Sequence, residues 1–588
     1  MLLQRLREYA DYRLSLPPTL YSEAPVRYII ELDGQGQLLS PKPTDTADPA
    51  SPRTRRGQRR LVPLVQRAFG VKPLLLADNA EYTLGLARET SSSRRVADCQ
   101  HAYLDLLERC LSETREPIVE AVYTFLHDNP ASRLELPEDF DRGGAITFRV
   151  DGVFPVDLPS VRAFWAGEND PARTLAPLMQ CLVCGEERPV LTRLQAKIKG
   201  IPGGQTPGTS IISANAEAFE SYGLSASLIA PTCASCGERF TQAANALLAG
   251  QESHIVLGGT AFIFWTREEV PFNLYTHLTD PHPEGVRGMI QAVRTGKWNP
   301  SEDEVAFYAT VLSGSGGRAA VRDWLDTTVG HVKQALAKWF QLQSIMQPNG
   351  EPPRPLGLNS LAYATVREAR DLSPPVPRAL LHAALTGVPL QWDLLYQAVR
   401  RNWAEQRVTH PRGALIKLVL LSQESDRREE DYMVQLDPKH PSPAYHCGRL
   451  LAVLEQAQRL AVPGINATIV DRFYGTASSA PASVFSRLMR GVQPHLSKLQ
   501  RDRRGAYFAL QQRLEEILGG VSQFPRTLTL EGQGLFTLGY YHQRAYDRAQ
   551  AREAAERRRQ GLPVEASADL PLEVLENIDE TETDEQEK

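Results

Sequence analysis

Hydrophobic and polar positions repeat with different periods along the chain. Residues 1–14 are amphipathic with a helical period, and residues 27–32 form a short apolar run of the β type. Leucines at helical spacing predict a helix over 96–130 that ends at the Asp128-Asn129-Pro130 segment. Further short β-type runs occupy 145–150 and 260–265.

Beyond residue 376 the pattern is mainly helical, and Gly or Pro separates most of the segments. The predicted helices span 378–386, 392–403, 415–422, 446–461, 483–489, 507–518 and 535–560. On the last of these, Tyr540, Tyr541 and His542 are predicted to pack between helices rather than to stack on bases.

These patterns predict an α+β protein with a mixed N-terminal and central part and a helical C-terminal bundle. The chain has 588 residues, which suggests two to four domains. The predicted regions are 1–145, α+β with a basic loop; 146–375, α+β with a zinc-knuckle insertion; 376–562, helical; and 563–588, an acidic disordered tail.

The charge is unevenly distributed. The formal net charge is -5, but residues 565–588 alone hold ten acidic residues and one lysine. Without that tail of net charge -9, the remaining 564 residues carry a net charge of +4. The acidic balance of the whole chain therefore does not exclude a nucleic-acid partner.

Two compartments are disfavoured. No run of about 18 apolar residues occurs, so no membrane span or membrane partner is expected. The N-terminus lacks the long apolar stretch and the cleavage site of a signal peptide. A cytoplasmic protein is therefore predicted.

Four of the seven cysteines form two Cys-x-x-Cys pairs, Cys181 with Cys184 and Cys233 with Cys236. A glycine follows each pair and permits a tight turn. Four thiolates suit a tetrahedral structural zinc ion and leave no open position for a catalytic water. The 48 residues between the pairs make the site the closure of a long insertion. The alternative is four reduced cysteines without a metal.

The residues 41–60 hold four prolines and predict an extended, mobile loop. It ends in a run of arginines, whose guanidinium groups suit DNA phosphates and base edges. The candidate DNA-binding residues of this loop are Arg53, Arg55, Arg56, Arg59 and Arg60, with Gln58 between them. A solvated basic loop is the alternative.

Four further residues are candidates for DNA contact. Lys72 and Asn79 follow the arginine run, although Asn79 also suits a local cap and Lys72 plain surface. Lys197 and Lys199 flank a glycine-rich turn at 200–204, where backbone amides approach a phosphate closely. An ordinary turn is equally compatible with that pattern.

Catalytic motifs fail on inspection. The stretch 203–210 has the glycine spacing of a phosphate-binding loop but carries Thr209 where the lysine is required. His127-Asp128 lacks companion metal ligands. We therefore expect no enzymatic activity. An independent zinc-containing nucleic-acid-processing enzyme remains the alternative, and a scaffold without DNA contact is a third hypothesis.

An ordered set of segments between residues 76 and 544 resembles the large subunit of the CRISPR-associated type I-C Cascade complex. The segments that carry the resemblance span 76–85, 198–205, 213–223, 242–248, 264–265, 317–324, 448–455, 466–469, 477–481, 495–499 and 534–544. The chain departs from the family pattern at 314–317, and the paired cysteines are no family hallmark.

The resemblance implies a non-catalytic role in a ribonucleoprotein. A guide RNA (crRNA) reads the target, while this subunit recognises the protospacer-adjacent motif in duplex DNA, aids strand separation and R-loop formation, and supports the displaced single strand. The implied protein partners are the Cascade backbone and guide-processing subunits, a small subunit and a separate helicase-nuclease. The C-terminal part resembles that small subunit, and Met433 is a candidate internal start for producing it separately.

Overall fold

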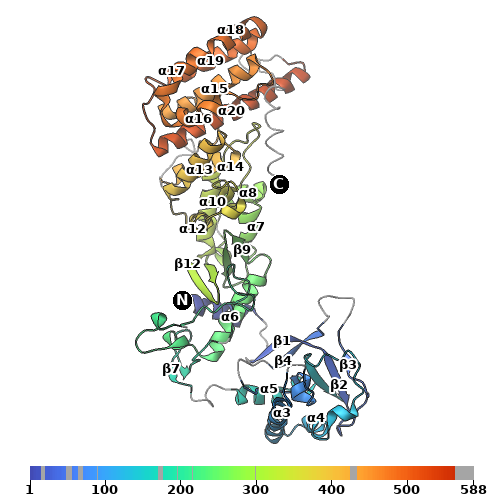
Figure 1. Cartoon of the computed structure of the whole chain (residues 1–588). Coiled ribbons are helices and arrows are strands. Elements are labelled where there is room, and N and C mark those ends of the chain that lie inside the picture. Colours follow the sequence, from blue (N-terminus) through green and yellow to red (C-terminus); the bar gives the residue numbers. More distant parts are fainter. Residues whose placement is uncertain are drawn as a thin grey trace. The chain divides into compact units, whose positions relative to one another are not determined.

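The computed structural model describes residues 1–14, 20–47, 56–63, 70–88, 91–169, 176–194, 196–214, 216–297, 299–423 and 433–562. Arg53, Arg55 and the acidic tail lie outside them. The chain divides into two compact units (Figure 1). Unit 1 comprises Met1–Gly200, Gly204–Ala246 and Gly316–Ala319, and unit 2 comprises Ile201–Gly203, Leu247–Ser315 and Ala320–Lys588.

Unit 1 contains a four-stranded sheet of order β3-β2-β6-β5. Its strands are β2 (Tyr28–Leu32), β3 (Thr44–Asp45), β5 (Ala77–Asp78) and β6 (Ile146–Val150). The central strands β2 and β6 run parallel, and each pairs with its outer neighbour in antiparallel fashion. Both central strands are almost entirely buried, in agreement with the apolar runs of the sequence.

Helices α2 (Ala80–Thr83), α3 (Ser93–Thr114), α4 (Pro117–His127) and α5 (Pro159–Glu168) accompany this sheet. Helix α3 packs against the other three, and α4 packs against β6. The prediction of one helix over 96–130 is wrong, because Arg115 takes a left-handed conformation and Pro117 starts a second helix. The predicted end at Asp128 is confirmed.

The predicted loop over 41–60 is also wrong at two places. Thr44–Asp45 pairs with β2 as β3. Gln58–Pro63 forms strand β4, which pairs in antiparallel fashion with β1 (Tyr21–Val26). Gln58, Arg59 and Arg60 thus lie on a two-stranded ribbon rather than on a loop. The remaining elements of unit 1 are α1 (Leu2–Arg13), β7 (Leu178–Gln180), β8 (Glu187–Pro189) and α6 (Ala234–Ala249).

Unit 2 begins with a four-stranded sheet of order β12-β11-β10-β9. Its strands are β9 (His254–Leu257), β10 (Thr260–Thr266), β11 (Ala306–Ser315) and β12 (Arg318–Thr328). Strand β10 is buried along almost its whole length, which explains its unbroken apolar sequence. The glycine-rich stretch around residue 316 forms the turn between β11 and β12, as the sequence suggests.

The rest of unit 2 is helical. Three helices lie between β10 and β11 in the sequence, namely α7 (Leu274–Thr279), α8 (Pro283–Thr295) and α9 (Pro300–Asp303), and α10 (Val329–Gln343) follows β12. The next are α11 (Leu358–Tyr363), α12 (Pro375–Thr386), α13 (Trp392–Glu405) and α14 (His410–Ser422). The last six are α15 (Pro443–Ala461), α16 (Ile469–Ser479), α17 (Pro481–Gly491), α18 (Gln493–Asp502), α19 (Arg504–Gly519) and α20 (Leu530–Arg559).

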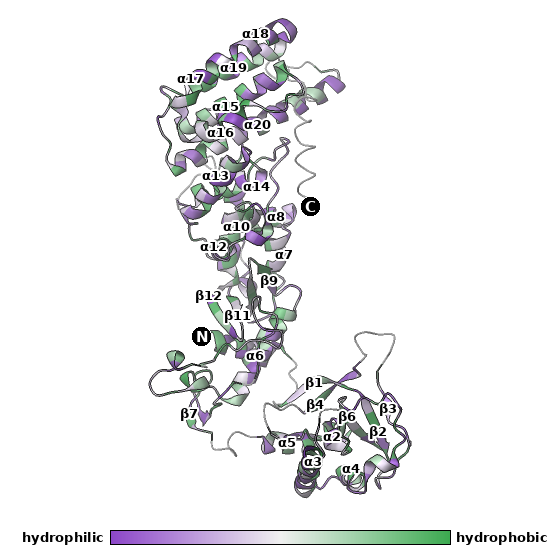
Figure 2. Ribbon diagram, in the orientation of Figure 1, coloured by the Kyte–Doolittle hydropathy of each residue, from purple (hydrophilic) through white to green (hydrophobic). Residues whose placement is uncertain are grey.

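One continuous hydrophobic core joins the sheet of unit 2 to these helices. The outer helices α17 and α18 carry both hydrophilic and hydrophobic residues (Figure 2), as expected for helices that cover a core on one face. The α+β class with a helical C-terminal part is therefore confirmed. The predicted domain boundaries stay a prediction.

Helices α15 and α20 cross at very short range. A Cβ atom on Gly448 of α15 would lie 1.9 Å from the carbonyl oxygen of Phe536, and one on Gly539 of α20 would lie 2.0 Å from that of Tyr445. Glycine at both positions lets the two backbones touch. The helices thus pack backbone to backbone at the centre of the C-terminal bundle.

Tyr540, Tyr541 and His542 of α20 are buried, which confirms their predicted packing role. The Tyr540 hydroxyl donates a hydrogen bond to the Glu455 carboxylate at 2.7 Å, and the Tyr541 hydroxyl donates one to the Met346 carbonyl at 2.7 Å. The His542 ring lies 2.9 Å from the Tyr445 hydroxyl. These side chains fix α20 in the bundle and are not available to bases.

Buried histidines predict an acid-sensitive helical unit. Burial lowers the pKa of His542 to about 3 and the pKa of His410 to about 4. In the unfolded chain both imidazoles titrate near 6.5. Below that pH the unfolded chain binds more protons than the folded chain, so the free energy of unfolding falls as the pH falls from 6.5 towards 4. We expect a lower urea midpoint at pH 5 than at pH 7.5.

A His542→Gln variant should show a smaller difference between the two midpoints, whatever its absolute stability. His101, which is largely exposed on α3, provides the control. The His101→Gln variant should keep the full difference. Equal midpoints at both pH values in the unaltered protein would contradict the argument.

Candidate functional site

The first cysteine pair lies on a turn between two short strands. Cys181 follows β7, and β8 returns in antiparallel fashion. The Gly185 amide donates to the Cys181 carbonyl at 2.8 Å, and the Cys181 amide donates to the Glu186 carbonyl at 2.9 Å. These bonds close the tight turn that the sequence predicts after Cys184, and they bring both sulfurs to one side.

The second pair lies at the start of α6, with Cys233 just before the helix and Cys236 in its first turn. Backbone bonds join the two pairs directly. The Leu182 amide donates to the Pro231 carbonyl at 2.9 Å, and the Cys233 amide donates to the Cys181 sulfur at 3.4 Å. The chain therefore leaves the cysteine cluster after Cys184 and returns to it at Cys233, with 48 residues between.

The four Sγ atoms lie within 4.8 Å of one another. Cys181, Cys233 and Cys236 are buried, and Cys184 is partly exposed. The chain thus gathers four sulfurs around one point, as tetrahedral zinc with bonds of about 2.3 Å requires. The sequence-based prediction that these four residues come together is confirmed, and the cluster can hold a metal ion.

The electrostatics of the cluster favour a cation. Hydrogen bonding from Cys236 lowers the pKa of Cys233 to about 5, against the effect of burial. The same bond, together with burial, raises the pKa of Cys236. A divalent cation would stabilise the deprotonated form of all four sulfurs.

The cysteine cluster also affects the pKa of Arg7 on α1. Burial opposes its charge, but the sulfurs of Cys236, Cys184 and Cys233 and the Asp11 carboxylate raise its pKa. Arg239 of α6 pairs with Asp11 at 2.7 Å and so ties α1 to α6. The positive charge of Arg7 would offset part of the negative charge of the cluster when its sulfurs are deprotonated. The sequence around Arg7 gave no sign of this role, because 174 residues separate it from Cys181.

The arginine ribbon, residues 56–60, contains the described part of the basic run. Arg56 is exposed and makes no hydrogen bond or ion pair with other residues that the structure describes. Gly57 has φ +104°, and a Cβ there would lie 2.2 Å from the Val26 carbonyl oxygen. Only glycine fits there, so the chain enters β4 with Arg56 at the end of the ribbon. Gln58 is exposed, and its backbone amide donates to the Thr46 hydroxyl at 2.9 Å.

The next two arginines have partners within unit 1. Arg59 is exposed and donates to the Glu23 carbonyl at 3.0 Å, with the Glu23 carboxylate at 3.5 Å. The Arg60 guanidinium lies 3.6 Å above the centre of the Phe154 ring and 3.6 Å from the Asp157 carboxylate. Arg60 is thus held against the protein, which leaves Arg56 and Arg59 as the more accessible cations of the ribbon.

Lys72 and Asn79 both belong to the segment that leads into α2. The Asn79 side chain accepts a hydrogen bond from the Glu81 amide at 3.0 Å and caps α2. The alternative of a local cap is therefore shown for Asn79. Lys72 is exposed, and its backbone amide donates to the Tyr82 hydroxyl at 3.3 Å.

Lys197 and Lys199 lie on either side of the buried Ile198. The Asn245 side chain of α6 donates to the Lys197 carbonyl at 3.1 Å and accepts from the Lys199 amide at 2.8 Å. Ile198 also pairs with Thr209 as an isolated bridge. The backbone between the two lysines is fixed, while the Lys199 side chain is exposed. This anchoring by Asn245 was not apparent from the sequence.

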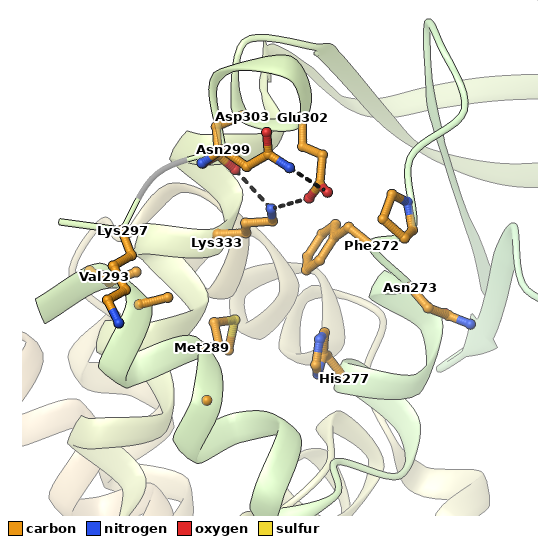
Figure 3. A pocket seen from close by; sticks show the side chains of 13 residues that line it. Phe272, Asn273, His277, Met289, Val293, Lys297, Asn299, Glu302, Asp303 and Lys333 are labelled. Atoms are coloured by element: carbon orange, nitrogen blue, oxygen red, sulfur yellow. Dashed lines mark hydrogen bonds and ion pairs between the residues drawn. The ribbon is translucent and has the colours of Figure 1, made fainter. Parts of the chain in front are cut away.

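A cavity of about 400 Å³ opens beside α8 and α10 in unit 2 (Figure 3). Phe272 and Met289 line its apolar side. On its polar side, Lys333 pairs with Glu302 at 3.0 Å and with Asp303 at 2.8 Å. Burial opposes the charge on Lys333, but the hydrogen bonds that its ammonium group donates to both carboxylates raise its pKa. Because two carboxylates balance the positive charge of Lys333, the cavity suits an apolar group better than a phosphate.

No helix among the described residues is long and apolar enough to cross a membrane. A search of curated proteins found no match. The family model described as CRISPR-associated protein (Cas_Csd1) matches residues 2–546, which includes both cysteine pairs, the arginine ribbon and the helical bundle. The chain therefore belongs to the Cas_Csd1 family of CRISPR-associated proteins.

Proposed function

We propose that this protein is the large, non-catalytic subunit of an RNA-guided type I-C Cascade complex. In this proposal it recognises the protospacer-adjacent motif in duplex DNA and aids strand separation. It also supports R-loop formation and provides a dock for a separate helicase-nuclease. Family membership supports a CRISPR-associated role, and the finer assignment rests on the resemblance of the ordered segments.

The observation that carries the DNA-binding part is the arginine ribbon. Two accessible guanidinium groups lie close together in sequence: Arg59 lies on the paired strand β4, and Arg56 lies two residues before that strand. Guanidinium groups bind phosphates through paired hydrogen bonds, and each contact releases counterions from DNA. A strand holds such groups at lower entropic cost than a loop, which suits recognition of one short duplex motif.

The metal centre supports the same proposal in a structural role. Four protein sulfurs would fill the coordination sphere of zinc and leave no position for a reacting water. A zinc ion there would join two distant parts of unit 1. The cluster contributes architecture in this proposal, and the DNA contacts come from the ribbon and from Lys199.

Removing two charges from the basic run is expected to weaken target binding in the reconstituted complex. The Arg55→Ala plus Arg56→Ala variant should bind a duplex with the correct flanking motif about tenfold more weakly near 0.1 M salt. The slope of log affinity against log salt should become shallower by about two, because two phosphate contacts are lost. Fluorescence anisotropy with labelled duplex over a salt series measures both quantities.

The matched control is Arg94→Ala plus Arg95→Ala. These two exposed arginines lie in the first turn of α3, and their removal changes the net charge by the same amount. The control should keep both affinity and salt slope. An unchanged affinity in the Arg55/Arg56 variant would instead favour a scaffold without DNA contact at this place.

A further inference from the structure

The segment 216–224 of unit 1 ends in a tight turn with an unusual residue at its tip. Ser221 and Leu224 pair as an antiparallel bridge, and the Leu224 amide donates to the Ser221 carbonyl at 2.9 Å. The two central residues, Tyr222 and Gly223, have φ values of +54° and +71°. Such turns favour Asn, Asp or Gly at both positions, so a tyrosine there is held in a costly backbone conformation.

The Tyr222 side chain is 99% exposed. A ring fully in water contributes no packing that would offset the strained backbone. The residue is therefore poorly explained by folding alone, and strain of this kind gathers at binding sites. Its position at the tip of a turn presents the ring to a ligand from outside the unit.

A second aromatic residue lies two positions before this turn, at the end of the short 3-10 helix Glu217–Phe219. Phe219 is about half exposed, and the Arg318 guanidinium lies 3.8 Å from the centre of its ring. The chain around Arg318 is anchored: the Ser210 amide donates to the Gly317 carbonyl, and the Ala319 amide donates to the Ser210 carbonyl, both at 2.9 Å. Phe219 and Arg318 thus form a stacked pair, and the backbone that carries Arg318 is anchored.

Charged residues of both signs belong to this region. Lys197 and Lys199 flank the bridge from Ile198 to Thr209, next in sequence to Ser210. The nearest acids in sequence are Glu217 and Glu220, and the Glu220 carboxylate accepts a hydrogen bond from the Ala226 amide at 3.3 Å. The cation in direct contact with a ring of this segment is Arg318 on Phe219. Aromatic rings combined with arginine are the recurring composition of sites for single-stranded nucleic acid.

The shape separates this ligand from an apolar peptide. A peptide anchor side chain needs a concave pocket around it, whereas a ring that is exposed on all sides offers a flat face. An unpaired nucleobase fits a flat face, because every base has a π surface that stacks on an aromatic side chain. Paired bases within a duplex have their faces covered by their neighbours.

We propose that Tyr222 is a stacking platform for an unpaired nucleobase of single-stranded nucleic acid, with the Phe219–Arg318 pair, three residues earlier in sequence at Phe219, as a second platform. This inference rests on the proposed function only in that both require a nucleic-acid partner. It assigns a site for unpaired bases that is distinct from the arginine ribbon, which is proposed to contact duplex DNA.

Binding of the full chain to a fluorescein-labelled 20-residue oligothymidylate tests the proposal by anisotropy. The Tyr222→Gly variant removes the ring and suits the left-handed backbone, so the turn is kept. Its affinity should fall about five- to 150-fold, as expected when one base loses its aromatic partner. Tyr222→Trp should keep the affinity, and Tyr222→Leu should lose it, because leucine is apolar but cannot stack.

An abasic strand of equal length and charge completes the design. The unaltered chain and the Tyr222→Gly variant should bind this strand equally. The proposal is overturned if Tyr222→Gly binds oligothymidylate normally, if the loss is equally large on the abasic strand, or if leucine substitutes fully for tyrosine. The Arg55→Ala plus Arg56→Ala variant separates the two proposals. If its duplex binding is normal while Tyr222→Gly weakens oligothymidylate binding, only the proposed role of the arginine run fails. If its duplex binding is weakened while Tyr222→Gly binds oligothymidylate normally, only the stacking proposal fails.

Discussion

Replacing Cys233 and Cys236 with serine is expected to abolish the binding of about one zinc ion per chain. The four sulfurs lie within 4.8 Å of one another, and three of them are buried. Structural zinc contributes about 10–16 kcal/mol of apparent binding free energy in small zinc domains, so loss of two ligands should be decisive. Metal analysis of the purified chain by mass spectrometry measures the stoichiometry directly.

The same variant should loosen the segment between the two pairs. Without a metal, the two ends of this segment would be joined by backbone hydrogen bonds, such as that from Leu182 to Pro231, and by thiol contacts. Hydrogen exchange in this segment should accelerate at least about tenfold, while exchange in α15 and α20 stays unchanged.

Cys99→Ala is the control, because Cys99 is buried in α3 and lies outside the cluster. This variant should retain the metal. If the unaltered chain, purified without chelators and in the presence of zinc, contained no metal, the four-sulfur site would be refuted. Four reduced cysteines would then be the correct interpretation.

Placing a methyl group at Gly448 is expected to disrupt the C-terminal bundle. The Cβ of Gly448→Ala would lie 1.9 Å from the Phe536 carbonyl oxygen and 2.8 Å from the Tyr540 amide nitrogen. Both atoms belong to the backbone of α20, so no side-chain rotation relieves the clash. The helices must separate, and we expect a loss of at least about 3 kcal/mol in the free energy of unfolding of unit 2. Urea denaturation followed by circular dichroism measures the change.

Gly475→Ala is the matched control, because it makes the same substitution inside α16. Nothing lies within 4 Å of the added methyl group. Alanine is the better helix former, so this variant should gain about 0.5–1 kcal/mol. Equal stability of Gly448→Ala and the unaltered chain would show that the two helices do not cross as described.

Local patterns predicted much of the secondary structure. The first helix, the strands at 28–32, 146–150 and 260–266, and most C-terminal helices appear close to their predicted positions. These segments have unambiguous periods, and caps or prolines mark their ends. Helices α16 and α18 were missed. Both are short, and α18 has only two buried residues, so its apolar signal is weak.

The metal cluster was predictable because two Cys-x-x-Cys pairs carry their geometry in their spacing. The arginine ribbon was not, since the pairing of β4 with β1 depends on contacts between residues about 40 positions apart. The cation–π contact of Arg60 with Phe154 has the same origin. Sequence composition identified the run of arginines but placed Gln58, Arg59 and Arg60 on a loop rather than on β4. It also gave no sign that Asn245 fixes the backbone at Lys197 and Lys199.

The burial of α20 has a consequence for the hypothesis that translation also starts at Met433. The Tyr541 hydroxyl bonds the Met346 carbonyl, and the Trp403 indole donates to Ser478 at 2.8 Å. A shorter product would lack both Met346 and Trp403, along with the apolar residues Leu395 and Leu420 that lie close to Gly534. The surface of α20 that these residues cover would become an exposed apolar patch. Such a product should therefore occur as an obligate assembly, with copies of itself or with another subunit, rather than as a free monomer.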